Sequence, residues 1–201
     1  TCICANRAYV QRSVYNEVME KLTERVGKMT VGNGMDNPDI GPLINEAAYI
    51  KVQEHIDDAV QKGAKLLVGG QRLEGGPYDN GYFVTPTVLA DATKEMLIHQ
   101  EETFGPVLPL IPFDDESEAI EMANDSIYGL AAYFYTENLS RAYRVAEALD
   151  FGIVGMNDAL PSTAQAPFGG MKQSGIGREG GHYGIEAFLE TKFVSIGLWD
   201  R

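Results

Sequence analysis

Two stretches of the chain repeat apolar residues with the period of an α-helix. The repeating positions are Val14, Val18, Leu22 and Val26 in the first stretch, and Tyr49, Val52, Ile56 and Val60 in the second. Gly63 follows the second stretch, and a glycine commonly ends a helix. Residues 32–42 lie between the stretches and are rich in Gly and Pro. We therefore predict two amphipathic helices separated by a loop.

Short apolar runs bounded by turn residues predict β-strands along the rest of the chain. These runs cover residues 7–11, 65–68, 82–89, 107–113, 130–135 and 153–156. Two more helices are predicted among them, one from an Asp114 or Asp115 cap through Ala123 and one from an Asn138 cap through Leu149. Strands that alternate with helices are typical of an α/β layered domain with a largely parallel sheet.

The alternation stops at Pro161. Residues 161–184 are Gly-rich, polar and without periodicity, and residues 188–198 then alternate as one extended strand. An open strand at a chain terminus favours aggregation, so we expect this strand to pair with a neighbouring subunit. We accordingly predict one main domain over residues 1–186 and an oligomerisation strand with its tail over residues 187–201.

The charge balance excludes several classes of partner. The chain has 29 acidic and 16 basic residues, a formal charge of −13, and no basic cluster. Nucleic acid and anionic membrane surfaces would be repelled. The longest nearly apolar stretch, residues 104–113, contains three prolines and has about half the length of a membrane-spanning helix. We expect a soluble protein.

The titratable residues predict no metal site. Cys2 and Cys4 are separated by one residue, which is neither a disulfide framework nor a zinc-ligand spacing. His55, His99 and His182 are isolated from one another in the sequence. A reducing, cytoplasmic setting fits two such cysteines. The first residue is Thr and no leader precedes Cys2, so we interpret the start as lying inside a longer chain.

Three segments carry candidate chemistry, and each has a plain structural alternative. The Thr-Cys-Ile-Cys run at residues 1–4 offers a nucleophile, although a free Cys is often a small core residue. In an extended strand its two cysteines would lie on the same side. Residues 101–106 carry paired carboxylates that are commonly only solvated. Residues 167–180 fit neither the Rossmann fingerprint nor the P-loop, so a structural loop is favoured.

Together, in this order and at these separations, the three segments resemble the aldehyde dehydrogenase family over essentially the whole chain. The resemblance rests on Cys2 followed by Ala-Asn-Arg, on Glu-Glu-Thr-Phe-Gly-Pro at residues 101–106, and on Pro-Phe-Gly-Gly-Met-Lys-Gln-Ser-Gly-Ile-Gly-Arg-Glu at residues 167–179. It implies the three-layer αβα catalytic domain of that fold. It also implies that the nucleotide-binding domain lies outside this chain.

The resemblance implies a role for each candidate residue. Cys2 would be the nucleophile, Glu102 would hold the nicotinamide ribose, Phe104 would pack beside the nicotinamide ring, and Phe168 would line the aldehyde pocket. The cofactor would be NAD or NADP, and the assembly a homodimer or homotetramer. The general-base Glu, the oxyanion-hole amide and the substrate-binding Arg are placed upstream of Thr1 by the family.

Within the family, residues 2–7, 129–134 and 177–180 look most like succinate-semialdehyde dehydrogenases. Ser162 matches the serine that contacts the distal carboxylate of the substrate in those enzymes. Glutarate semialdehyde stays open, because one methylene discriminates weakly. Cys4 is a candidate redox partner of Cys2 through a reversible disulfide. The alternative from another class is a non-catalytic assembly fragment.

Overall fold

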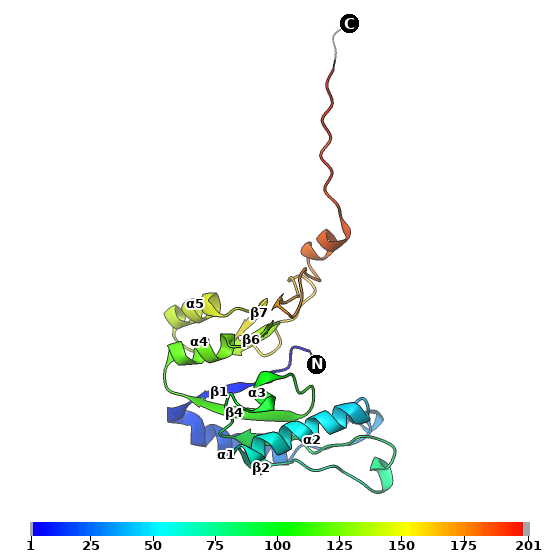
Figure 1. The fold of residues 1–201 in the computed structure, drawn as a ribbon, viewed down its shortest axis with the longest axis vertical. Coiled ribbons are helices and arrows are strands. Elements are labelled where there is room, and N and C mark those ends of the chain that lie inside the picture. The colour runs from blue at the N-terminus through cyan, green and yellow to red at the C-terminus, as the bar shows by residue number, and fades with distance from the viewer. Residues whose placement is uncertain (1, 199–201) are drawn as a thin grey trace. The chain divides into compact units, whose positions relative to one another are not determined.

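The computed structural model describes residues 2–198, which divide into two compact units (Figure 1). The first unit is Thr1–Ser126 and the second is Ile127–Arg201. Strands and helices alternate along the chain, so the predicted α/β class is confirmed. None of the helices among residues 2–198 is long and apolar enough to cross a membrane.

A four-stranded sheet forms the centre of the first unit. Its strands lie in the order β1 (Ala8–Gln11), β4 (Val107–Phe113), β3 (Thr87–Ala90) and β2 (Lys65–Val68). β1 and β3 run parallel to β4, whereas β2 runs antiparallel to β3. The sheet is therefore mostly parallel, as predicted.

The helix α1 (Tyr15–Gly27) covers one face of this sheet. Val88 and Leu110 point to that face and form a buried cluster with Tyr15. The Tyr15 hydroxyl donates to the Leu110 carbonyl and accepts from the Asp91 N–H, at 3.2 and 2.8 Å. Burial raises the pKa of Tyr15 to about 12, so its phenol stays protonated and keeps both bonds.

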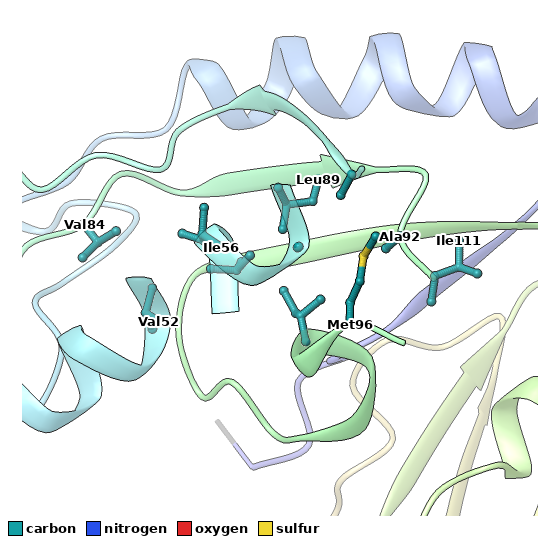
Figure 2. Close-up of a cluster of buried hydrophobic side chains, with 11 residues drawn as sticks. Val52, Ile56, Val84, Leu89, Ala92, Met96 and Ile111 are labelled. Carbon is teal, nitrogen blue, oxygen red and sulfur yellow. The ribbon is translucent and has the colours of Figure 1, made fainter. Parts of the chain in front are cut away.

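The helix α2 (Glu46–Gln61) covers the opposite face. Leu89 and Ile111 follow Val88 and Leu110 in their strands, and successive strand residues point to opposite faces. Figure 2 shows them in one cluster with Val52 and Ile56 of α2. Met96 and Ile98, at the short helix α3 (Leu97–Gln100), complete this core. The first unit is thus a helix–sheet–helix sandwich.

The predicted helix caps are present. Asp115 caps α4 (Glu116–Asn124) by accepting from the Glu118 N–H at 3.0 Å. Asn138 caps α5 (Leu139–Ala148) by accepting from the Arg141 N–H at 2.9 Å. Each side-chain oxygen satisfies an amide that has no partner inside the first turn of its helix.

The second unit contains two small sheets. β6 (Ala131–Phe134) runs parallel to β7 (Ile153–Met156), and β5 (Tyr128–Gly129) runs antiparallel to β8 (Met171–Lys172). The remaining elements of both units are short 3-10 turns, η1 (Arg12–Val14), η2 (Gly34–Asp36), η3 (Gly76–Tyr78) and η4 (Tyr183–Phe188).

Two predicted strands differ from the structure. The strand expected at residues 82–89 is regular only over β3, and before it Tyr82 and Val84 make isolated bridges. Pro86 intervenes and has no N–H to donate, so the ladder cannot continue through it. The range predicted as a strand, residues 188–198, starts at the last residue of η4 and contains no strand.

Beyond η4 the described chain has no regular element. Residues 189–198 pair with no strand among residues 2–198, and Phe193, Ile196 and Leu198 are 78–93% exposed. Pairing of this segment with a neighbouring subunit stays a prediction. The rest of the predicted tail, residues 199–201, lies outside the described residues.

Candidate active site

Cys2 and Cys4 are exposed and not disulfide-bonded to each other. Residues 2–4 form a turn and a bend, so the extended conformation that would place both thiols on one side is absent there. The chain becomes extended only at Ala8, where β4 supplies a partner for β1. The candidate nucleophile therefore lies on a turn that precedes the sheet. Thr1 lies outside the described residues.

The side chain of Asn6 ties this turn to a distant segment of the first unit. Its Nδ2 donates to the carbonyls of Ile98 and Glu101, at 3.2 and 3.1 Å. Its Oδ1 accepts from the Thr103 N–H at 3.0 Å. One amide thereby joins the chain four residues after Cys2 to the segment that contains Glu102.

His55 of α2 holds the same segment from the core side. Its side chain is only 2% exposed, and its Nδ1 lies 3.0 Å from the Thr103 Oγ1. Its Nε2 lies 3.6 Å from a Glu101 carboxylate oxygen, and the Lys51 Nζ lies 4.0 Å from the same oxygen. A carboxylate only accepts, which favours the tautomer with the proton on Nε2 and with Nδ1 accepting from Thr103.

The charge on His55 is disfavoured by its surroundings. Burial is the main cause that lowers the pKa of His55, and the nearby Lys51 lowers it further, whereas Glu101 raises it. The neutral imidazole is therefore favoured at pH 7.

The anchored segment turns two side chains outward. Thr103 is buried, whereas Glu102 and Phe104 on either side of it are exposed, Phe104 by 59%. Phe104 has a φ of 51°, a left-handed conformation that costs a non-glycine residue about 1–3 kcal/mol. Such a conformation persists only where the surroundings hold it, and Asn6 and His55 hold the preceding residue, Thr103.

The second unit has its own candidate pocket. A cavity of about 210 Å³ contains both Ser162 and Phe168 in its wall. The other lining residues are Gly152, Ile153, Val154, Pro161, Thr163, Ala166 and Pro167. Most of these lining residues are apolar, and Ser162 and Thr163 are the two with polar side chains.

The Gly-rich segment shapes this pocket. Phe168 exchanges two backbone hydrogen bonds with Glu179, at 2.7 and 2.6 Å. The Arg178 guanidinium donates to the Gly170 carbonyl at 2.8 Å. A Cβ at Gly152 would lie 1.9 Å from the Gly169 oxygen, so only glycine permits this approach. The segment acts as a packed loop that fixes Phe168, which agrees with the structural interpretation of its sequence.

The predicted residues therefore fall into two groups. Cys2, Cys4, Glu102 and Phe104 belong to the first unit, and Ser162 and Phe168 belong to the second. Within residues 2–198 no three His, Cys, Asp or Glu side chains are arranged to hold a metal ion.

Sequence reasoning missed Asn6 and His55 as parts of the site. Asn6 stands in the Ala-Asn-Arg segment that follows Cys2, but nothing local indicated its partner, because Thr103 is 97 residues away. A signal existed for His55, which stands beside Ile56 in the apolar repeat of α2. A buried polar side chain requires a partner, so a histidine at such a position indicates a hydrogen bond into the core.

The sequence model of the aldehyde dehydrogenase family matches residues 1–194. The chain belongs to the aldehyde dehydrogenase family. Membership of the family confirms the resemblance that Cys2 and the segments at residues 101–106 and 167–179 predicted.

Relatives of known type within the aldehyde dehydrogenase family are similar at about half of all positions. The chain is 53% identical over 199 residues to the NADP⁺-dependent succinate-semialdehyde dehydrogenase GabD of Escherichia coli K12. It is 52% identical over 199 residues to the glutarate-semialdehyde dehydrogenase of Pseudomonas putida KT2440. Each match covers 98% of this chain and 40% of the relative, so the chain spans less than half the length of these relatives.

A solved structure shows the same fold. The crystal structure of an aldehyde dehydrogenase from Brucella melitensis biovar abortus 2308 superposes with a TM-score of 0.90 at 56% identity. The match covers 96% of this chain and 39% of that one. The predicted aldehyde dehydrogenase fold is therefore confirmed.

Proposed function

We propose that a full-length protein carrying this chain oxidises succinate semialdehyde to succinate with NAD or NADP as hydride acceptor. The observation that carries the proposal is the placement of Cys2. Its free, exposed thiol lies on a turn that Asn6 bonds to the segment presenting Glu102 and Phe104. A nucleophile and a cofactor-binding segment are thus linked through one side chain.

Cys2 carries the covalent chemistry in this proposal. Its thiolate Sγ attacks the aldehyde carbon, and the carbonyl oxygen becomes the oxyanion of a thiohemiacetal. Loss of hydride from that carbon leaves a thioester on Sγ, which water hydrolyses to the acid and the free thiol. The backbone N–H of Cys2 is our candidate donor to the oxyanion. Only a few per cent of ordinary cysteine is thiolate at pH 7, so a base or a charged neighbour must assist.

The residues of the first unit fit a nicotinamide nucleotide. The exposed carboxylate of Glu102 can accept hydrogen bonds from the two hydroxyls of a ribose, and the exposed ring of Phe104 offers a flat apolar face to a pyridine ring. The nicotinamide, when bound, accepts the hydride. Glu102 and Phe104 would orient it, and the bonds of Thr103 to Asn6 and His55 would keep them in place.

The second unit supports a substrate that is apolar in its middle and charged at its end. Ser162 would donate its hydroxyl to the distal carboxylate, and Phe168 would pack against the methylenes. Both residues line one cavity. The similarity to a succinate-semialdehyde dehydrogenase supports the same choice.

Glutarate semialdehyde is the second candidate substrate. A glutarate-semialdehyde dehydrogenase is 52% identical to this chain, and the succinate-semialdehyde dehydrogenase of Escherichia coli is 53% identical. The two aldehydes differ by one methylene, which changes binding in an apolar pocket by about 1–3 kcal/mol. Comparing kcat/KM for the two aldehydes decides between them.

Three further roles complete the proposal. With a peroxide as the oxidant that takes up two electrons and two protons, Cys4 would form a reversible disulfide with Cys2 and so switch off the nucleophile, since both thiols are exposed. The apolar segment at residues 188–198 would pair with a neighbouring subunit in a homodimer or homotetramer. The cytoplasmic location inferred from the two cysteines stays a prediction.

The experiment that tests the function compares two single-cysteine variants of the full-length protein. Cys2→Ala should abolish succinate-semialdehyde oxidation with either dinucleotide, whereas Cys4→Ala should retain it, because only Cys2 forms the thioester. Activity that survives Cys2→Ala would favour another nucleophile. A wild-type protein that oxidises no aldehyde would favour the non-catalytic assembly module.

A further inference from the structure

Asn6 and His55 converge on one residue from opposite sides. Asn6 accepts from the Thr103 N–H at 3.0 Å, and His55 Nδ1 lies 3.0 Å from the Thr103 Oγ1. Both interactions span long distances in the sequence, 97 and 48 residues. The backbone and the side chain of Thr103 are therefore each held by a different element of the fold.

Asn6 also holds Glu101, whose carboxylate lies near His55. Asn6 donates to its carbonyl at 3.1 Å, and its carboxylate lies 3.6 Å from the His55 Nε2. Glu101 and Thr103 flank Glu102, so both neighbours of the candidate ribose ligand are fixed. The backbone of Glu102 is thereby placed by its two neighbours, and its side chain is exposed.

The anchoring has an energetic reason. Phe104 adopts a left-handed φ of 51° with a ring that is 59% exposed, so neither its backbone preference nor its own burial keeps it there. Thr103, the preceding residue, is buried and bonded on both its N–H and its hydroxyl. Its two bonds supply the restraint that the conformation of Phe104 requires.

We infer that Asn6 and His55 are positioning residues that act through Thr103 to hold Glu102 and Phe104 in the orientation that binds the nicotinamide half of the cofactor. This inference rests on the proposed function, because it assigns Glu102 and Phe104 to the nicotinamide ribose and ring. It goes further by naming the residues that determine their geometry. We call the bonds of Asn6 and His55 to Thr103 the clamp. Because Asn6 also belongs to the segment of Cys2, the clamp keeps the turn that carries Cys2 attached to residues 101–103.

The clamp should therefore affect the binding affinity of the nicotinamide half of the dinucleotide and leave that of the adenosine half unchanged. The clamp does not concern the adenosine half, which the family binds on a domain outside this chain. Loosening it should weaken binding of a complete dinucleotide while leaving a fragment without nicotinamide unaffected. A variant that only destabilises the protein has no reason to discriminate between the two ligands.

The test measures dissociation constants by calorimetry on the full-length protein. The probes are NADP⁺ or NAD⁺, whichever binds more tightly, and the matching ADP fragment with or without its 2′-phosphate. Asn6→Ala, His55→Asn and Thr103→Val should each raise the dissociation constant of the dinucleotide about tenfold, the usual effect of one lost hydrogen bond in a buried network. The constant for the fragment should change less than about twofold.

A matched control is available in the same unit. Asn45→Ala removes the cap of α2, a single bond of 2.9 Å to the Ala48 N–H, without touching the clamp. It should change neither constant. The double variant Asn6→Ala/His55→Asn should lose less than the product of the two single effects, because both residues act through Thr103.

The outcomes separate the inference from the function on which it rests. Suppose that the wild type binds the dinucleotide. The clamp is then overturned if the variants bind the dinucleotide and the fragment more weakly to the same extent, or if they bind neither more weakly. A wild type that binds no dinucleotide would overturn the proposed function and the inference together. If Asn6→Ala does not fold, Thr103→Val still decides the matter, since it removes only one hydroxyl.

Discussion

The Cγ2 methyl of Val52 occupies the space that a side chain at Gly105 would need. A Cβ built on Gly105 would lie 2.3 Å from that methyl, closer than any real contact. Gly105 directly follows Phe104, so its close approach to α2 is a further restraint on the segment that presents Glu102.

Gly105→Ala should therefore destabilise the protein by about 1–3 kcal/mol, the usual cost of forcing a methyl into a packed site. Val52 is itself fully buried, so the loss in the double variant Gly105→Ala/Val52→Ala should be smaller than the sum of the losses in the two single variants. Urea unfolding of the full-length variants measures both. Gly41→Ala is the control, since nothing lies within 4 Å of its added Cβ. Equal losses at both glycines would contradict the packing argument.

The hydroxyl of Ser162 should strengthen substrate binding only when the far end of the substrate carries a carboxylate. Ser162→Ala should raise KM for succinate semialdehyde roughly ten- to a hundredfold, the effect of losing a hydrogen bond to a charged group. It should leave KM for an uncharged aldehyde of similar length nearly unchanged. Thr163→Val, at the neighbouring lining residue, is the control. Equal increases for both aldehydes would remove Ser162 from carboxylate recognition.

The buried histidines of the first unit predict a loss of stability on mild acidification. Burial is the main cause that lowers the pKa of both His55 and His99, so the unfolded chain takes up protons at a higher pH than the folded one. The contribution of these two histidines to the free energy of unfolding is then fully present above about pH 6.5. It is lost as the pH drops through their folded pKa values.

The measurement is the urea midpoint of the full-length protein between pH 7.5 and pH 5. The wild type should lose stability over this range, and His55→Gln/His99→Gln should lose clearly less. His182→Gln, at an exposed histidine, should behave like the wild type. If the double variant loses as much stability on acidification as the wild type, groups other than these histidines cause the loss.

Local sequence signals predicted much of the fold. The strands β2, β4 and β7 have the predicted limits, because each is an apolar run bounded by turn residues. Asp115 and Asn138 predicted the starts of α4 and α5, since a cap depends only on residues within the next turn.

Features that depend on distant contacts were not predictable in this way. The helix α3 has only four residues and is held by tertiary contacts, including a 2.7 Å bond from the Leu97 N–H to Asp58. The antiparallel direction of β2 and the convergence of Asn6 and His55 on Thr103 likewise depend on the folded chain. Motif spacing identified Cys2, Glu102 and Ser162 as candidates, but it gave no information on what holds them.

The covalent role of Cys2 is tested most directly by rapid-quench peptide mass spectrometry of the full-length protein turning over succinate semialdehyde and dinucleotide. The account predicts a succinyl thioester on Cys2, absent from Cys4, that hydroxylamine removes and that does not form when the dinucleotide is omitted. A succinyl group on Cys4 or another residue, with Cys2 unmodified during turnover, would contradict it.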